Sequence, residues 1–195
     1  MGPRHARIWS ELPQTRLVSV FDILPERSGE VARSLGAAAC DGLEELLQDR
    51  EVTIFSICVD DQAHLAPCLA AASAGKHVLV ERPLATTVTE SDAIIAACEK
   101  AGVKLMVGHV VRFDHRYAVA RQAIADGAVG DVIQTFGRRN NILASGRMIA
   151  ARTSVAFFLG VHDIDIMRWF VGSDVVRVHA ESASKALADV PAEDS

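Results

Sequence analysis

The first half of the chain alternates short apolar runs with helical stretches. Apolar runs rich in Val and Ile predict strands, and the segments between them carry helix start and stop signals. The predicted strands are 17–21, 52–59, 77–80 and 104–107, and the predicted helices are 4–12, 25–35, 42–48, 62–74 and 89–101. This order predicts βαβ units, and therefore an α/β fold with a doubly wound, Rossmann-type parallel sheet.

Two local features refine this prediction. The run at 52–59 is continuous rather than alternating, which is typical of a strand buried on both faces of a parallel sheet. Asp41 with Glu44, and Thr89 with Asp92, have the three-residue spacing of a capping box. We therefore expect these pairs to cap the helices that follow them.

The pattern changes after residue 108. Helices are predicted at 113–125 and 160–170, and strands at 131–139 and 175–182. In the last of these, Val176, Val178 and Ala180 alternate with polar residues, as in a strand with one exposed face. We expect a domain boundary near residue 110, with residues 1–110 forming the doubly wound domain and residues 111–195 forming part of an α+β domain.

The doubly wound pattern lacks its usual opening. Such a domain normally begins with a strand, the loop G-x-G-x-x-G and a helix whose N-terminus holds a pyrophosphate. This chain begins on the predicted helix, with only Gly2 before it. We expect the first strand and most of the glycine loop to lie upstream of Met1. Without that strand, 17–21 and 52–59 lack their common neighbour.

Gly2 and Asp22 have a spacing that points to a dinucleotide. They lie twenty positions apart, close to the interval between a glycine loop and the acid that hydrogen-bonds the ribose. Asp22 also ends a predicted strand, as that role requires. A glycine at a helix start and a solvated turn aspartate explain the same residues, and the spacing alone favours that simpler interpretation.

Composition excludes several classes of protein. Half of the 195 residues are hydrophobic and the net charge is −5, so the chain can bury a core and has no basic footprint for nucleic acid. The sequence shows no apolar run of membrane-spanning length and no secretory signal. Its four cysteines are scattered among apolar neighbours, which predicts free thiols and a cytoplasmic location.

No residues have the spacing of metal ligands, so we expect no metal. The pair His162 and Asp165 is too small to predict a metal site. Four further histidines have no convergent partners in the sequence pattern: His5, His77, His115 and His179.

Four segments in chain order carry a more specific pattern. They are Met1-Gly2 with Arg4-His5-Ala6; His64 with 74–85 (AGKHVLVERPLA); Met106-Val107-Gly108-His109 with Arg112-Phe113; and 159–165 (LGVHDID). Together they resemble the motifs of the glucose-fructose oxidoreductase/inositol dehydrogenase/MocA (Gfo/Idh/MocA) family of NAD(P)-dependent oxidoreductases. Members of that family are much longer, so the resemblance implies a chain truncated at both ends.

The resemblance implies an enzyme that transfers a hydride between a nicotinamide cofactor and a hydroxyl-bearing carbon of a sugar, cyclitol or related polyol. NAD is the expected cofactor and NADP is possible. It also implies a homo-oligomer, formed through the sheet of a substrate domain that begins at residue 111. The alternatives are a non-catalytic dinucleotide-binding module, serving as a sensor or assembly subunit, and an inactive fragment.

Site residues follow from the motifs and from the predicted strand ends. For the cofactor they are Gly2, Asp22, Arg27, Cys58, Val59, His64, Glu81, Arg82 and His109, and for the substrate they are Arg112, His162 and Asp165. An exposed helix arginine explains Arg27 equally well.

Two residues are candidates for the proton chemistry. Arg82 stands where the family has a lysine, and because a guanidinium keeps its proton it can support an alkoxide but cannot accept a proton. An imidazole titrates near neutrality, so His162 suits that acceptor role. Many relatives carry an aspartate where this chain has Phe158. Asp165, or more weakly Asp163, is expected to orient the His162 ring. From spacing alone, a core or capping histidine would be favoured.

Overall fold

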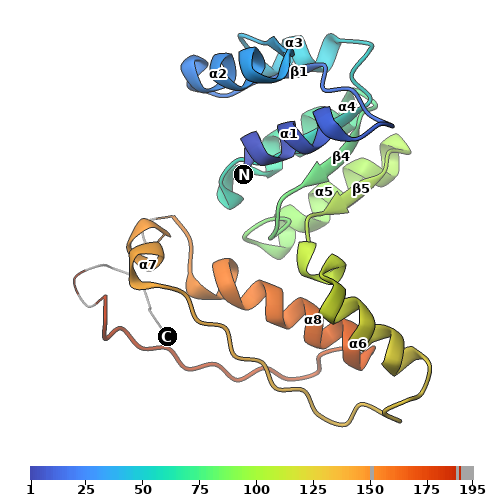
Figure 1. The fold of residues 1–195 in the computed structure, drawn as a ribbon, viewed down its shortest axis with the longest axis vertical. Helices are drawn as coiled ribbons and strands as arrows, with labels where there is room; N and C mark the ends of the chain where they lie inside the picture. Colours follow the sequence, from blue (N-terminus) through green and yellow to red (C-terminus); the bar gives the residue numbers. More distant parts are fainter. Residues whose placement is uncertain (150–151, 188, 190–195) are drawn as a thin grey trace. The chain divides into compact units, whose positions relative to one another are not determined.

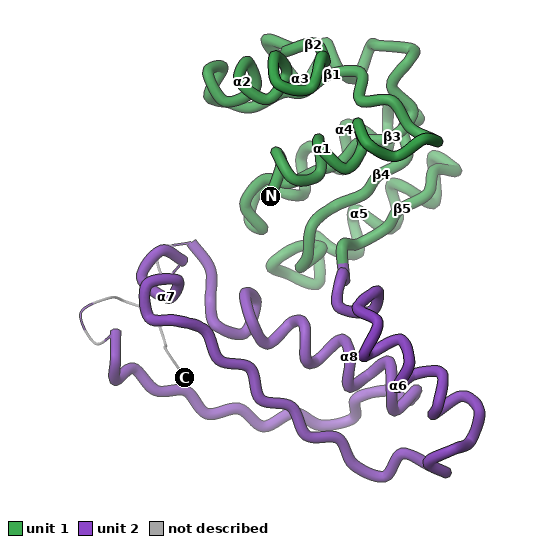
Figure 2. The backbone as a smooth tube through the Cα atoms, viewed as in Figure 1, with its two compact units in different colours: residues 1–108 green, residues 109–195 purple. Residues whose placement is uncertain are grey.

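The chain forms two compact units, Met1–Gly108 and His109–Ser195 (Figure 2). The structure is a computed structural model that describes residues 1–149, 152–187 and 189. Each unit is described by itself below.

The first unit contains two small parallel sheets. β1 (Ser19–Val20) pairs with β2 (Ala38–Ala39), and β3 (Ile54–Ile57), β4 (His77–Val80) and β5 (Leu105–Val107) pair in that order. Every pairing is parallel, which confirms the predicted α/β architecture. Within the described residues β1 pairs only with β2 and β3 only with β4, so each has one unpaired edge.

Helices connect these strands, as predicted. They are α1 (Gly2–Glu11), α2 (Pro25–Leu35), α3 (Leu43–Gln48), a 3₁₀ turn (Asp61–Ala63), α4 (Leu65–Ser73) and α5 (Val88–Ala101). α4 packs against α5 and against β3 and β4, while α1 contacts β3 and α2 (Figure 1). Gly102 ends α5 in the left-handed conformation (φ 66°), which costs a glycine little because it has no Cβ.

The predicted capping boxes are wrong in their residues. α5 is capped by Thr87, whose hydroxyl accepts the Glu90 N–H at 3.2 Å, so the cap lies two positions before Thr89. Thr89 and Asp92 instead lie within the helix. An N-cap residue has an extended backbone directly before the helix, which lets its side chain accept an N–H of the first turn. Thr87 has this backbone conformation (φ −131°, ψ 154°).

The box at Asp41 and Glu44 also fails. α3 begins after Gly42, whose extended backbone makes it the cap residue without a side chain to bond. Asp41 instead donates its own N–H to the Glu45 carboxylate at 3.0 Å. The acid therefore reaches back from four residues away rather than three.

The core of the first unit lies between the three-stranded sheet and its helices. Its buried residues are Val52, Phe55, Ile57, Cys68, Ala71, Ala72, Val78, Val80, Ala85, Ile94 and Cys98. In β3 only Phe55 and Ile57 are buried, while Ile54 is 42% exposed. The prediction of a strand buried on both faces is therefore wrong, because α4 packs on β3 from one side and α1 does not cover Ile54.

The second unit is helical in the part that the structure describes. It contains a 3₁₀ turn (Val110–Phe113), α6 (His115–Ala125), α7 (Leu143–Ile149), a π-helical turn (Ala156–Gly160) and α8 (Val161–Val171). The rings of Tyr117 on α6 and Phe170 on α8 lie 6.3 Å apart, and Trp169 stacks on Phe170. The contact between Tyr117 and Phe170 joins the two longer helices.

The strands predicted at 131–139 and 175–182 are not present. Both segments lack strand pairing, and their apolar side chains are exposed: Ile133 is 95% and Val176 97% exposed. An alternating pattern selects a face to bury but supplies no partner for the backbone N–H and C=O groups. Within the described residues, neither segment pairs with another.

Across the described ranges, no helix combines the length and the apolar character that a membrane span requires.

Candidate functional site

The carboxyl ends of β3 and β4 bring several predicted site residues to one edge of the sheet. Cys58 and Val59 follow β3, and Glu81 and Arg82 follow β4. Parallel strands end on the same edge, which is where open α/β sheets bind ligands. β5 ends beside them, since the N–H of Gly108 donates to the Val80 carbonyl at 2.7 Å.

His5 lies at the centre of this edge, although the sequence pattern gave it no partners. Its Nδ1 is 2.8 Å from the hydroxyl of Ser56, and its Nε2 is 3.1 Å from Oε1 of Glu81. The side chains of His5 and Glu81 are 14% and 9% exposed. The prediction of no convergent partner is therefore wrong for His5, because its partners are 51 and 76 positions away in the sequence.

Charge is stabilised on both members of this pair. Hydrogen bonds with Cys58 and then Glu81 outweigh burial and raise the pKa of His5 from 6.5 to about 9. Burial raises the pKa of Glu81, but hydrogen bonds from His5 and from the N–H of Arg82 outweigh it, so the pKa is lowered. Near neutral pH the pair is an imidazolium and a carboxylate.

Arg82 is fixed through its main chain. Its N–H donates to Oε2 of Glu81 at 3.2 Å, and the Arg82–Pro83 peptide bond is cis. The Arg82 side chain is half-buried. The structure thus places Arg82 at the predicted edge, next to a carboxylate that is itself held by His5.

His64 lies beneath the edge and is 1% exposed. Its Nδ1 is 2.9 Å from the carbonyl oxygen of Pro83, and its Nε2 is 3.2 Å from that of Val59. The ring therefore ties the end of β3 to the segment after β4. These contacts are with main-chain atoms, so His64 shapes the edge from below.

The residues predicted for the adenosine side of a dinucleotide lie near the start of the unit. Asp22 follows β1, is half-buried, and accepts the N–H of Leu24 through Oδ1 at 2.9 Å. Gly2 is the first residue of α1, and a Cβ there would lie 4.0 Å from Cys58 Cβ. Arg27, in the first turn of α2, is exposed. A strand-end carboxylate and a helix start near the sheet edge fit the ribose and phosphates of NAD.

In the second unit, Asp165 is the centre of a charged cluster. Arg112 donates to it from Nε at 2.8 Å and from Nη2 at 2.5 Å, and Nδ1 of His109 is 3.6 Å away. Asp165 is 11% exposed. Three residues that the sequence predicted for ligand binding therefore lie together in the structure. They are His109, predicted for the cofactor, and Arg112 and Asp165, predicted for the substrate.

His162 lies on α8 directly after the π-helical turn at 156–160. The two acids expected to orient its ring each bind an arginine. Asp165 binds Arg112, and Asp163 accepts hydrogen bonds from Nε and Nη2 of Arg139, the shortest at 2.7 Å. The orientation of the His162 ring by these acids stays a prediction. π-Helical turns are frequent at functional sites, but no sequence pattern announces this one.

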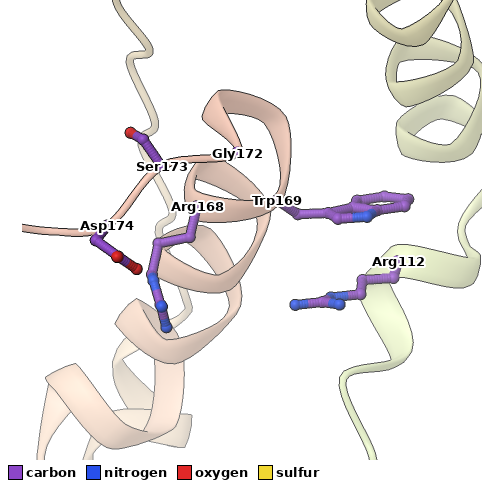
Figure 3. A pocket seen from close by; sticks show the side chains of 6 residues that line it. All are labelled: Arg112, Arg168, Trp169, Gly172, Ser173 and Asp174. Carbon is purple, nitrogen blue, oxygen red and sulfur yellow. The ribbon is translucent and has the colours of Figure 1, made fainter.

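A pocket of about 320 Å³ lies beside this cluster (Figure 3). It is lined by Arg112, Arg168, Trp169, Gly172, Ser173 and Asp174. The guanidinium carbon of Arg112 is 5.6 Å from the centre of the Trp169 ring, a cation–π contact that holds Arg112 in addition to its hydrogen bonds with Asp165.

All four cysteines are free thiols, as predicted. Burial raises the pKa of Cys68 to about 12, whereas Cys58 is half-buried at the sheet edge. Among the described residues, no three His, Cys, Asp or Glu side chains gather as metal ligands.

Two family models match the chain. A model described as an oxidoreductase family with an NAD-binding Rossmann fold matches residues 1–109, and the GFO/IDH/MocA C-terminal domain matches residues 117–195.

Individual proteins agree with these matches. Inositol 2-dehydrogenase of Rubrobacter xylanophilus is 30% identical over 189 residues, 95% of this chain and 54% of that protein. 2,7-Anhydro-N-acetylneuraminate hydratase of Mediterraneibacter gnavus is 27% identical over 176 residues, 88% of this chain and 46% of that protein. The crystal structure of a putative myo-inositol dehydrogenase from Sinorhizobium meliloti 1021 has a TM-score of 0.84 at 25% identity, covering 97% of this chain and 59% of that one. The chain thus spans about half the length of the curated relatives that it matches.

The two models follow each other along the chain, and the Rossmann fold that the first one describes agrees with the parallel sheets of the first unit. The chain belongs to the Gfo/Idh/MocA oxidoreductase family.

Proposed function

We propose that the protein transfers a hydride between a nicotinamide cofactor and a hydroxyl-bearing carbon of a sugar, cyclitol or related polyol. The observation that carries this proposal is the match of both family models in order, with an inositol 2-dehydrogenase among the similar proteins. The gathering of Cys58, Glu81 and Arg82 at one sheet edge supports it.

NAD is the proposed cofactor. When bound, it accepts the hydride. Asp22 would hold the ribose hydroxyls through its second carboxylate oxygen, because Oδ1 is already engaged by the N–H of Leu24. Gly2 would lie near the phosphates, and Cys58, Val59 and Glu81 would line the nicotinamide side of the same edge.

The residues of the chain must manage the proton. Oxidation of a C–OH group releases a hydride from carbon and a proton from oxygen, and leaves a C=O double bond. We assign the proton to His162, because a guanidinium such as Arg82 keeps its own proton at neutral pH. Arg82 would stabilise the developing alkoxide, and Arg112, held by Asp165, would orient a substrate hydroxyl.

Replacing His162 tests this assignment. His162→Ala should lower turnover about a hundredfold or more with cofactor affinity nearly unchanged. His179→Ala is a matched control, since that ring is 83% exposed and its Nε2 lies 3.4 Å from Oε1 of the similarly exposed Glu181. Near-normal turnover and an unchanged pH profile in His162→Ala would reject the assignment.

A non-catalytic dinucleotide-binding module is the second candidate. Arg82 in place of the family's lysine and Phe158 in place of an aspartate favour it. Titration with NADH fluorescence, beside a turnover assay on a polyol panel, separates the two functions. The panel includes a 2,7-anhydro sugar acid, since one similar protein is named for hydrating such a compound. Binding without turnover would support the module.

Asp22 also carries the choice of cofactor. Its carboxylate should accept the ribose hydroxyls of NAD and repel the 2′-phosphate of NADP. Arg27 nearby would weaken this preference by binding that phosphate. A higher catalytic efficiency with NADP that does not change in Asp22→Ala would reject NAD as the preferred cofactor.

We further propose that the protein self-associates in the cytoplasm. Val176 and Val178 are 97% and 78% exposed, and exposed apolar side chains in an unpaired extended segment favour association. Light scattering of the full chain should then give a mass above that of a monomer. A monodisperse monomer that unfolds cooperatively would contradict association.

A further inference from the structure

The contact between His5 and Glu81 joins three elements of the first unit. His5 is on α1, its partner Ser56 is in β3, and Glu81 follows β4. Both ring nitrogens of a protonated His5 are donors, so one N–H meets the Ser56 hydroxyl and the other meets the Glu81 carboxylate. The two hydrogen bonds fix the orientation of the ring.

The carboxylate of Glu81 connects the His5 ring to the main chain of Arg82. Oε1 binds the His5 ring, and Oε2 accepts the main-chain N–H of Arg82. On its other side the segment is confined by Gly108, whose N–H binds the Val80 carbonyl and where a Cβ would lie 3.6 Å from Glu81 Cα. The direction of the chain at Arg82 thus depends on where the Glu81 carboxylate is held.

We propose that His5 is a positioning residue: its ring holds the Glu81 carboxylate, which in turn sets the main chain that carries Arg82 into the site. The proposal rests on the proposed function in one respect, the role of Arg82 toward substrate. The groups that face the His5 ring are Ser56 in β3, Cys58 directly after β3 and Glu81 after β4.

A purely structural contact would behave differently. A buried ion pair is weak evidence of its own role, because its effect on stability alone does not separate a structural contact from a positioning contact. If His5 only filled space, its loss would lower stability without changing the Arg82 main chain. If it positions Glu81, the Arg82 amide should respond first.

The test uses the full 195-residue chain and three variants: His5→Ala, His5→Gln and Glu81→Gln. His5→Gln keeps an amide donor and serves if His5→Ala fails to fold. His77→Gln is the matched control, because His77 lies in the same unit and its Nδ1 accepts the N–H of Lys104. NMR follows the titration of the His5 ring and the hydrogen exchange of the Arg82 and Gly108 amides.

We expect the His5 ring to titrate near pH 9, and its pKa to fall by about one unit or more in Glu81→Gln. The Arg82 amide should exchange about tenfold faster in His5→Ala, with the Gly108 amide unchanged and His5→Gln between the two. His77→Gln should leave the Arg82 amide as in the parent chain. A His5 ring that titrates near 6.5, or an Arg82 amide that stays equally protected in His5→Ala, overturns the proposal.

Turnover supplies a second measurement. In His5→Ala, kcat should fall about tenfold while the affinity for NADH, measured by fluorescence, stays within about twofold. The alkaline limb of the kcat profile should move to lower pH in Glu81→Gln. If the parent chain binds no NADH and turns over no polyol, the proposed function fails, and the two NMR measurements still decide the role of His5.

Discussion

Asp165 offers a direct test of the charged cluster in the second unit. It accepts two hydrogen bonds from Arg112, and His109 lies 3.6 Å from the same carboxylate. In Asp165→Asn one acceptor oxygen remains, but the new amide group points N–H donors at a guanidinium that has only donors. The bidentate contact cannot form again.

The exposure of the two partners sets the size of the effect. Removing one partner of a buried pair typically costs about 3–5 kcal/mol, whereas exposed pairs contribute about 0–1 kcal/mol. The side chain of Asp165 is 11% exposed, but that of Arg112 is 40% exposed. In Asp165→Asn, water can therefore solvate part of the Arg112 guanidinium that has lost its carboxylate. We expect Asp165→Asn to lower the free energy of unfolding by about 2 kcal/mol. At an m-value of about 2 kcal/mol per molar, the urea midpoint falls by about 1 M.

Trp169 provides the assay. The chain has two tryptophans, Trp9 on α1 and Trp169 on α8, so Trp9→Phe leaves a single fluorophore in the second unit. Trp169 contacts Arg112, and its emission therefore reports on the cluster itself. Urea titrations of Asp165→Asn are compared with the parent in this background.

Asp114→Asn is the matched control. Asp114 also holds an arginine, Arg116, through two side-chain hydrogen bonds, but this pair is exposed on the helix surface. Asparagine caps a helix as well as aspartate does, so the cap of α6 is retained. Asp114→Asn should hardly move the midpoint. Equal shifts in the two variants would show that burial of Asp165 does not govern the strength of its contact.

Three further results are expected. The pKa of His5 is raised from 6.5 to about 9 and that of Glu81 is lowered from 4.5, so stabilisation by the pair is complete between pH 4.5 and 6.5. The urea midpoint of unfolding should therefore decline as pH rises from 6.5 toward 9 and as pH falls below 4.5. A urea midpoint that does not change with pH would contradict this. Ile94→Ala removes a fully buried side chain and should lower the free energy of unfolding by about 2–5 kcal/mol. Ile95→Ala, at the exposed neighbouring position, should lower it far less. Similar losses in the two variants would exclude burial as the cause. Gly102→Ala should lower the free energy of unfolding by about 1 kcal/mol, because residue 102 has a left-handed backbone, although the space around a Cβ there is open. A variant more stable than the parent would show that this backbone conformation does not strain alanine.

The first unit could be predicted closely because local and global signals agree there. The predicted helix 25–35 and strand 77–80 match α2 and β4 to the residue. Proline at the first helical position and glycine after the last mark α2 in the sequence. A short apolar run between two such helices is typical of a strand in a parallel sheet. The local pattern and the tertiary packing therefore favour the same structure.

The second unit was harder to predict for a physical reason. The alternation at 175–182 defines two faces, but a strand needs a neighbour to bond its main chain, and no local pattern names that neighbour. The structure leaves the segment extended and unpaired, with Val176 exposed. Helices supply their own hydrogen bonds, which is why the predicted helices at 113–125 and 160–170 correspond to α6 and α8.

The site divides in the same way. Residues that follow strands were located correctly at one sheet edge, because the carboxyl ends of parallel strands meet there. His5 was missed because its partners, Ser56 in β3 and Glu81 after β4, lie at sequence separations that no periodicity covers. One sign was available: His5 precedes the buried Ala6 and lies one turn before Trp9, so it is on the inward side of α1.

Helical spacing alone does not identify every partner of a carboxylate. His162 and Asp165 are three residues apart, which allows contact, and Asp165 also binds Arg112, which is 53 positions away in the sequence. A guanidinium matches both oxygens of a carboxylate and keeps its charge at every physiological pH, whereas an imidazole offers one donor and is often neutral. Spacing states which side chains can meet, and a guanidinium is the stronger partner for a carboxylate. Asp165 is therefore well placed to hold the side chain of Arg112.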